Sequence, residues 1–208
     1  NSLVPYDKTV NYSYKYLNQD YLNLDVTGNR FEEFFKFVTV HEVGHTLGLK
    51  HPHNTSTLNP IVTTGDPFTA ENGFSSYDTV MSYYIPTGIL TDKSYYAQTP
   101  MRLDVTVLQE IYGTSHYEGS SSNTVHSISK SNSYETFVDY SGSNTIDASS
   151  ANRGWEIQLT DPTPQLGRGK ELGKTLPEAQ FVDLMGNFDH AVGTDYADSI
   201  KGSSGTNT

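Results

Sequence analysis

The 208-residue chain contains no cysteine. This absence excludes a disulfide framework, and it restricts any metal site to nitrogen and oxygen ligands. Basic residues are also scarce, because 13 Lys and Arg stand against 24 Asp and Glu and leave a formal net charge of −11. Nucleic acid is therefore not an expected partner, since phosphate binding needs clustered Lys and Arg. The acidic balance is compatible instead with calcium, which takes oxygen ligands.

Long apolar runs are missing as well. Hydrophobic residues make up 35% of the chain, the mean hydropathy is −0.53, and the longest apolar run, residues 34–40, is interrupted by Lys36. A membrane span needs about 20 apolar residues, so none is expected. The chain begins at Asn1 without a signal peptide or an initiating Met. We therefore expect a mature form or a fragment.

The most informative segment is His-Glu-Val-Gly-His-Thr-Leu-Gly-Leu-Lys-His, which starts at His41. Positions four apart share one face of a helix, so His41 and His45 direct two imidazoles to one place. Imidazole is a zinc ligand, and catalytic zinc sites combine three protein ligands with an open position for water. Gly48 tolerates the left-handed conformation that ends a helix, and a reversal there would return His51 as the third ligand.

Glu42 follows the first of these histidines, so its carboxylate could reach a water on the metal and act as general base. Two histidines four apart can also lie on a solvated helix face, and for a lone pair we would favour that interpretation. Here the Glu, the Gly and the third His all fall at the required offsets, which favours the metal site. At every fixed position the segment resembles the elongated zinc signature of the metzincin metalloproteases, H-E-x-x-H-x-x-G-x-x-H.

A helix is predicted over about residues 30–47, ahead of and through this signature. Phe34, Val38, His41 and His45 share one stripe of that helix. We therefore expect the packing of Phe34 and Val38 to fix where the imidazoles point.

Two further segments flank the helix. Residues 9–16 alternate polar and aromatic side chains and predict a strand. Residues 52–78 are rich in Pro, Gly, Asn, Ser and Thr and predict a long surface loop. His53 lies in that loop; an exposed histidine is the expected interpretation, and a fourth metal ligand is the alternative.

The segment 77–84, Tyr-Asp-Thr-Val-Met-Ser-Tyr-Tyr, resembles the metzincin Met-turn. This resemblance implies that Met81 forms an apolar floor under the metal. In the serralysin and astacin families a Tyr two residues after that Met is an additional zinc ligand, and the matching position is Tyr83. A phenol there could leave the metal and donate a hydrogen bond to the oxyanion of the tetrahedral intermediate. For Tyr84 we expect packing only.

Apolar residues at helical spacing predict an amphipathic helix over residues 102–112, ended by Gly113. Pro100 and Met101 before it and the Ile-Tyr-Gly at its end resemble the last helix of the serralysin catalytic domain. In that family a calcium-binding parallel β-roll follows.

The tail carries the same resemblance. Residues 137–147 are similar to the segment that opens the β-roll of the family. Residues 193–201 partly fit the nonapeptide G-G-x-G-x-D-x-U-x, and the pattern repeats nine residues later. In such repeats acidic side chains and turn carbonyls bind calcium. The calcium candidates are Asp139, Asp195, Asp198 and Asn207. The alternative is a Gly/Ser-rich tail with accidental spacing.

We expect an α+β fold in two regions. The first region, residues 1–113, is a metzincin-like zinc protease domain with the signature helix and the Met-turn, and its N-terminal part is expected to be incomplete. The second region, residues 114–208, is all-β with degenerate RTX-like repeats and resembles the start of a parallel β-roll. Trp155, the only Trp, is expected in the core of the second region.

The resemblance implies a secreted, extracellular bacterial zinc endopeptidase of the serralysin type that cleaves extended peptide or protein substrates. Zinc would be held by His41, His45, His51 and Tyr83, with Glu42 as general base. Calcium as a second cofactor, a proteinaceous inhibitor as a further partner and a monomeric chain are also implied. Two alternatives stay open. One is a non-catalytic extracellular metal-binding module, and the other is a zinc peptidase of another metzincin family with an unrelated β tail.

Overall fold

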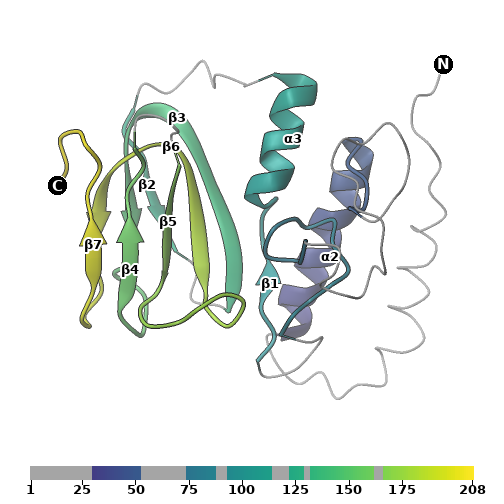
Figure 1. Ribbon diagram of the computed structural model, residues 1–208, viewed down its shortest axis with the longest axis horizontal. Coiled ribbons are helices and arrows are strands. Elements are labelled where there is room, and N and C mark those ends of the chain that lie inside the picture. The colour runs from purple at the N-terminus through teal and green to yellow at the C-terminus, as the bar shows by residue number, and fades with distance from the viewer. Residues whose placement is uncertain (1–29, 53–73, 88–92, 114–121, 129–131, 162–165) are drawn as a thin grey trace.

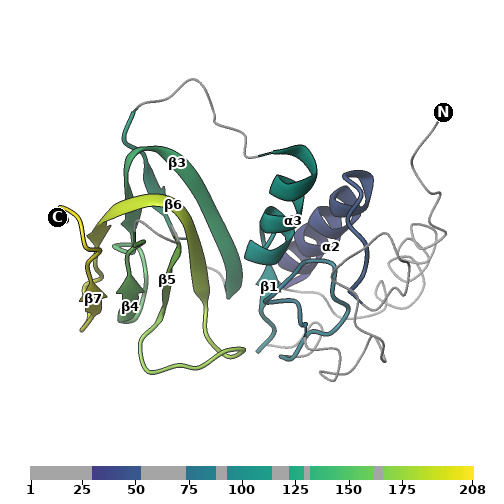
Figure 2. The ribbon, with the colours of Figure 1, turned by 45° about the horizontal axis from the view of Figure 1, so that its top comes forward.

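The computed structural model describes residues 30–52, 74–87, 93–113, 122–128, 132–161 and 166–208. In both views the helices lie at one end of the molecule and most of the strands at the other (Figure 1, Figure 2). The elements in chain order are α2 (Arg30–Thr46), β1 (Tyr96–Ala97), α3 (Arg102–Tyr112), β2 (Val125–Ser127), β3 (Ser133–Asp147), β4 (Trp155–Gln158), β5 (Leu166–Glu171), β6 (Phe181–Val192) and β7 (Ser199–Lys201). The expected α+β class is confirmed. The strand predicted over residues 9–16 lies outside the described residues.

Both predicted helices form. α2 ends at Thr46, one residue before the predicted end, and α3 has the predicted bounds. Acidic side chains in the first turn of α2, Glu32 and Glu33, complement the positive end of the helix dipole. No helix in the described part of the chain has the length and apolar character needed to cross a membrane.

The strands form one mixed sheet in the order β1-β3-β6-β5-β4-β7, and β2 pairs with β3 outside that path. The pairs β1–β3, β2–β3, β3–β6 and β4–β7 are parallel, whereas β4–β5 and β5–β6 are antiparallel. The parallel pairs agree with the expected β-roll, but the two antiparallel pairs show that the sheet is not purely parallel. The β-roll therefore stays a prediction.

Two hydrophobic cores stabilise this arrangement. The first core packs the helices against the sheet, and it includes Tyr134 of β3 and Phe181 of β6 as well as residues of the first region. The second core lies within the strands of the second region, where Trp155 is only 1% exposed, as predicted. Because β1 pairs with β3 and the first core includes side chains from both regions, the two regions share packing across the predicted boundary at residue 113.

One predicted feature was partly wrong. Residues 53–73 of the predicted surface loop lie outside the described residues, but at its end Ser75 and Ser76 are buried. They are buried because this stretch leads into the Met-turn segment, where the backbone N–H of Ser76 donates to Tyr84 O at 2.8 Å.

Candidate metal centre

The end of α2 brings the three signature histidines together. His41 and His45 are one turn apart on the helix, and the chain then reverses at Gly48, whose φ is +92°. The N–H of Leu49 donates to Gly44 O and the N–H of Gly48 donates to His45 O, both at 3.0 Å. This is the Schellman pattern, which satisfies the last helical carbonyls by turning the chain back on itself. The reversal predicted at Gly48 is confirmed.

The reversal places the third histidine against the other two. The Nε2 atom of His51 lies 3.1 Å from Nε2 of His41 and 3.0 Å from Nε2 of His45. Tetrahedral zinc with Zn–N bonds of about 2.0–2.1 Å holds its nitrogens about 3.4 Å apart, so small adjustments would admit an ion. Among the described residues, these three histidines are the one group of three or more His, Cys or acidic side chains that is arranged to hold a metal.

The remaining ring nitrogens of the helical histidines are hydrogen-bonded to the backbone. Nδ1 of His41 lies 2.7 Å from Val80 O, and Nδ1 of His45 lies 3.0 Å from Leu49 O. A carbonyl accepts only, so each Nδ1 carries a proton, and in the neutral ring Nε2 then presents its lone pair. The backbone thus selects the tautomer that can bind a metal.

Aromatic rings surround the three imidazoles. Tyr83 stacks on His41 with ring centroids 5.5 Å apart, and its centroid lies 4.3 Å from that of His51. Phe37, one turn before His41, is buried with its ring centroid 6.3 Å from that imidazole. The sequence interpretation expected Phe34 and Val38 to fix the imidazoles. Phe34 is buried and Val38 packs against the same core. The structure adds Phe37 as the buried ring next to His41, because residues four apart lie above one another on a helix.

Glu42 has a buried carboxylate oxygen that accepts no hydrogen bond. Its Oε2 is buried, and no hydrogen-bond partner reaches it. A buried acceptor without a partner costs free energy unless a ligand or water satisfies it. This oxygen is therefore suited to accept a hydrogen bond from a water molecule or a substrate.

The Met-turn packs directly against α2. Met81 is 2% exposed, and a Cβ at Gly44 would come within 2.6 Å of its sulfur. Glycine between the two helical histidines therefore lets Met81 of the Met-turn approach the helix backbone, and its role as an apolar floor under a metal stays a prediction.

Two functional contacts were missed by the sequence interpretation. Val80 supplies the carbonyl for His41, and the buried Asp104 accepts the N–H of Val80 at 2.8 Å. Burial raises the pKa of Asp104 to about 6, although hydrogen bonds from Thr79, Val80 and Met101 act in the opposite direction. The sequence contained a signal for Asp104. It stands at the third position of the predicted helix, where an acidic side chain can accept the free N–H of the residue before the helix, as in a capping box.

The calcium candidates are dispersed. Asp139 Oδ2 lies 3.1 Å from Nε2 of His126, and Asp195 is exposed. Neither belongs to a group of three acidic or His side chains around one point among the described residues. Their calcium role stays a prediction.

The two other calcium candidates occupy turns with the same geometry, nine residues apart. Asp198 accepts hydrogen bonds from the N–H and the hydroxyl of Thr194 at 2.7 and 2.9 Å. Asn207 accepts the same two bonds from Ser203, both at 2.9 Å. In each unit a Cβ on the first glycine would meet this Asp or Asn side chain. The nine-residue repeat is thus also a repeat of structure, and calcium binding by it stays a prediction.

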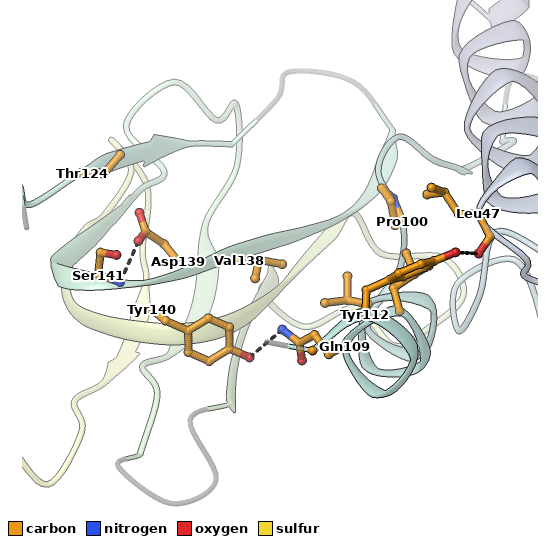
Figure 3. A pocket seen from close by; sticks show the side chains of 12 residues that line it. Leu47, Pro100, Gln109, Tyr112, Thr124, Val138, Asp139, Tyr140 and Ser141 are labelled. Atoms are coloured by element: carbon orange, nitrogen blue, oxygen red, sulfur yellow. Dashed lines mark hydrogen bonds between the residues drawn. The ribbon is translucent and has the colours of Figure 1, made fainter. Parts of the chain in front are cut away.

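A cavity of about 560 Å³ lies between α3 and β3 (Figure 3). Tyr112 borders it and donates its hydroxyl hydrogen to Leu47 O at 2.8 Å, while Gln109 lies 3.4 Å from the hydroxyl of Tyr140. The histidines and Glu42 are not among its lining residues. This cavity is therefore separate from the candidate metal centre.

Comparison with known proteins gives an independent result. Residues 25–101 match a family model described as Met-zincin. The chain is 30% identical over 167 residues to a serralysin of Photorhabdus sp. strain Az29, in an alignment that covers 78% of this chain and 34% of that protein. It is 29% identical to a serralysin of Photorhabdus laumondii, with 90% and 37% covered, and 28% identical to metalloprotease AprA of Pseudomonas entomophila, with 78% and 34% covered. The chain spans about a third of the length of these relatives.

Proposed function

Because the chain is a serralysin-type metzincin by its matched segment and its relatives, we propose that it is a zinc-dependent endopeptidase. The observation that carries the proposal is the convergence of the Nε2 atoms of His41, His45 and His51. The buried Oε2 of Glu42, the next residue of the helix after His41, has no hydrogen-bond partner, which supports it. Three imidazole nitrogens are the donor set of a catalytic rather than a structural zinc site, and Glu42, which is not a proposed ligand, would supply the base.

Zinc, when bound, supplies Lewis-acid polarisation of a carbonyl and lowers the pKa of a coordinated water. The three histidines would hold it through Nε2, in the tautomer that Val80 O and Leu49 O select. Glu42 Oε2 would accept a proton from the attacking water and pass it to the leaving amine nitrogen. Burial of this oxygen excludes competing solvent and strengthens its interaction with the proton.

Tyr83 is proposed as a further ligand that can turn to donate its phenolic O–H to the developing oxyanion. Its ring lies against both His41 and His51, which supports a position at the metal centre. Loss of this donor should reduce the rate more than the affinity for substrate.

The proposed substrate is an extended segment of a protein, read through its backbone by addition to a strand edge. We further propose secretion to an extracellular location, a monomeric chain, calcium as a second cofactor in the second region, and a proteinaceous inhibitor as a partner. The excess of acidic residues and the nine-residue turn repeat support the calcium part.

The test compares cleavage of casein by the zinc-loaded chain with cleavage by Glu42→Gln, with and without a chelator. We expect the substitution to lower kcat by about 10²- to 10⁴-fold and to leave zinc stoichiometry unchanged, because Glu42 is not a proposed ligand. Chelation should abolish activity in the wild type.

Glu32→Gln is the matched control, because Glu32 is an exposed carboxylate on the same helix and should not affect cleavage. The endopeptidase proposal is wrong if the wild-type chain binds one zinc but cleaves casein no faster than Glu42→Gln. That result would support a non-catalytic metal-binding module instead.

A further inference from the structure

A single buried carboxylate joins the start of α3 to the Met-turn. Asp104 is 2% exposed and accepts the backbone N–H of Met101 at 2.8 Å, which satisfies a free donor at the helix start. The same oxygen accepts the N–H of Val80 at 2.8 Å, and the other oxygen accepts the hydroxyl of Thr79. Asp104 therefore accepts three hydrogen bonds, two of them from the Met-turn segment.

The Met-turn segment in turn contacts the metal centre through the same residue. Val80 donates its N–H to Asp104 and accepts the Nδ1 proton of His41 with its carbonyl, at 2.8 and 2.7 Å. The Thr79 hydroxyl also accepts the N–H of Met81 at 3.0 Å. With its N–H held by a carboxylate, Val80 has little freedom to rotate its carbonyl away from the imidazole.

We propose that Asp104 is a positioning residue for the metal centre, which orients His41 by holding Val80 and Thr79 of the Met-turn in place. This inference rests on the proposed zinc site. The path runs from a carboxylate on α3 through one residue of the Met-turn to a histidine on α2, and each link is a hydrogen bond of a buried group. Outer partners of metal ligands typically change metal affinity by 10- to 100-fold when removed.

A simpler role for Asp104 is that it only caps α3. A cap contributes about 1 kcal/mol to stability, and its loss would not alter a metal site on another element. The two roles therefore differ in a measurable way, because only a positioning residue should change the zinc affinity and the geometry around the metal.

The test uses Asp104→Asn and Thr79→Val in the full chain. Asn keeps the shape and one acceptor oxygen, and Val removes the hydroxyl while keeping the branched shape. We expect zinc affinity, measured by competition with a chromophoric chelator, to fall about 10- to 100-fold in Asp104→Asn, and by less in Thr79→Val. With cobalt in place of zinc, the visible absorption bands of both variants should shift, because His41 is no longer fixed.

Two controls separate positioning from stability. Leu159→Ala opens a cavity in the second core, where Leu159 is 2% exposed, and should lower the melting temperature without changing the cobalt spectrum. Glu110→Gln replaces an exposed carboxylate on α3 and should change neither.

The inference is wrong if Asp104→Asn and Thr79→Val fold and bind zinc with wild-type affinity and an unchanged cobalt spectrum. If Asp104→Asn does not fold, Thr79→Val decides alone. Failure of the wild type to bind one zinc would instead contradict the proposed function, so the two failures are distinguishable.

Discussion

Both ring nitrogens of each helical histidine have a defined role. At His41 and His45 the Nδ1 proton is donated to a backbone carbonyl, and the Nε2 lone pair faces His51. The side chains alone would not achieve this, since a free imidazole exchanges tautomers. Glu42 differs, because its buried Oε2 has no partner, as expected of a group that acts on a proton rather than on structure.

The pKa of Asp104 makes the stability of the folded chain depend on pH. Burial raises this pKa from 3.8 to about 6. A carboxyl group with a higher pKa in the folded state stabilises that state below its unfolded pKa, and this contribution is lost as the pH rises through the folded pKa. We therefore expect the contribution of Asp104 to decline between about pH 4 and about pH 6.

The measurement is urea unfolding of metal-free wild type and Asp104→Asn across that pH range. The difference in unfolding free energy, wild type minus variant, should fall with rising pH by on the order of 2 kcal/mol. A difference that stays constant with pH would contradict the raised pKa.

At the scale of elements, the turn after α2 has two functions. It ends the helix in the Schellman pattern, and it places both His51 and the carbonyl of Leu49 that orients His45. A comparable device bends β3, whose register with β6 shifts between Asp139 and Asn144. There the fully buried Asn144 donates to the carbonyls of Ser141 and Asn187, both at 2.9 Å. In each case irregular backbone is retained because its polar groups are satisfied.

Gly48→Ala tests the turn. No atom lies within 4 Å of a Cβ at this position, so the cost comes only from the backbone φ of +92° and should be about 1–2 kcal/mol of stability. Because His51 depends on this turn, zinc affinity should fall as well, and Gly48→Asn should be milder, since Asn tolerates a positive φ better.

Gly173→Ala is the matched control for this prediction. Gly173 also has a positive φ, +74°, with nothing within 4 Å of a Cβ, and it lies in the connection between β5 and β6. It should lose similar stability, measured by urea unfolding, but no zinc affinity. Equal losses of zinc affinity in the two variants would show that the effect is not specific to the metal centre.

At the scale of the whole molecule, the metal centre and the sheet share one core. The ring of Tyr134 on β3 lies 6.1 Å from that of Tyr77, at the start of the Met-turn segment, and 5.0 Å from that of Phe181 on β6. Its hydroxyl donates to Pro177 O at 2.5 Å. Gln98, next to β1, donates its side-chain N–H to Glu33 O on α2 at 3.0 Å. The helices and the sheet are therefore expected to unfold together.

Thermal unfolding can test this cooperativity with two probes. Trp155 is the only Trp and is buried in the second core, so its fluorescence reports on the sheet, whereas circular dichroism at 222 nm is dominated by the helices. We expect the two transitions to coincide. Tyr134→Ala should lower both melting temperatures together, because loss of a buried aromatic side chain reduces the free energy of unfolding by about 3–5 kcal/mol.

Tyr196→Ala is the control, because Tyr196 is 55% exposed and its loss should have little effect. Chelation of zinc should lower both transitions together, since binding stabilises the folded state. Separate transitions for fluorescence and dichroism would show that the two regions unfold independently.

The sequence by itself determined those features that depend on neighbours along the chain. His41, His45, Gly48 and His51 lie within eleven residues, so helix periodicity and one glycine turn were enough to predict their convergence. The two helices and the nine-residue turn repeat were predictable for the same reason, because their hydrogen bonds are local.

Only the tertiary structure decided what orients His41. Val80 is 39 residues from His41, and Asp104 is 24 residues further on, and no periodicity relates such positions. Tyr134 and the Met-turn segment share a core, and the sheet contains both parallel and antiparallel pairs. Both features likewise arise when distant segments compete to bury the same apolar surface. Local pattern selects the proposed ligands and the Leu49 carbonyl that orients His45. Long-range packing fixes the Val80 carbonyl and the Asp104 carboxylate, because a hydrogen bond between distant segments exists only after the chain has folded.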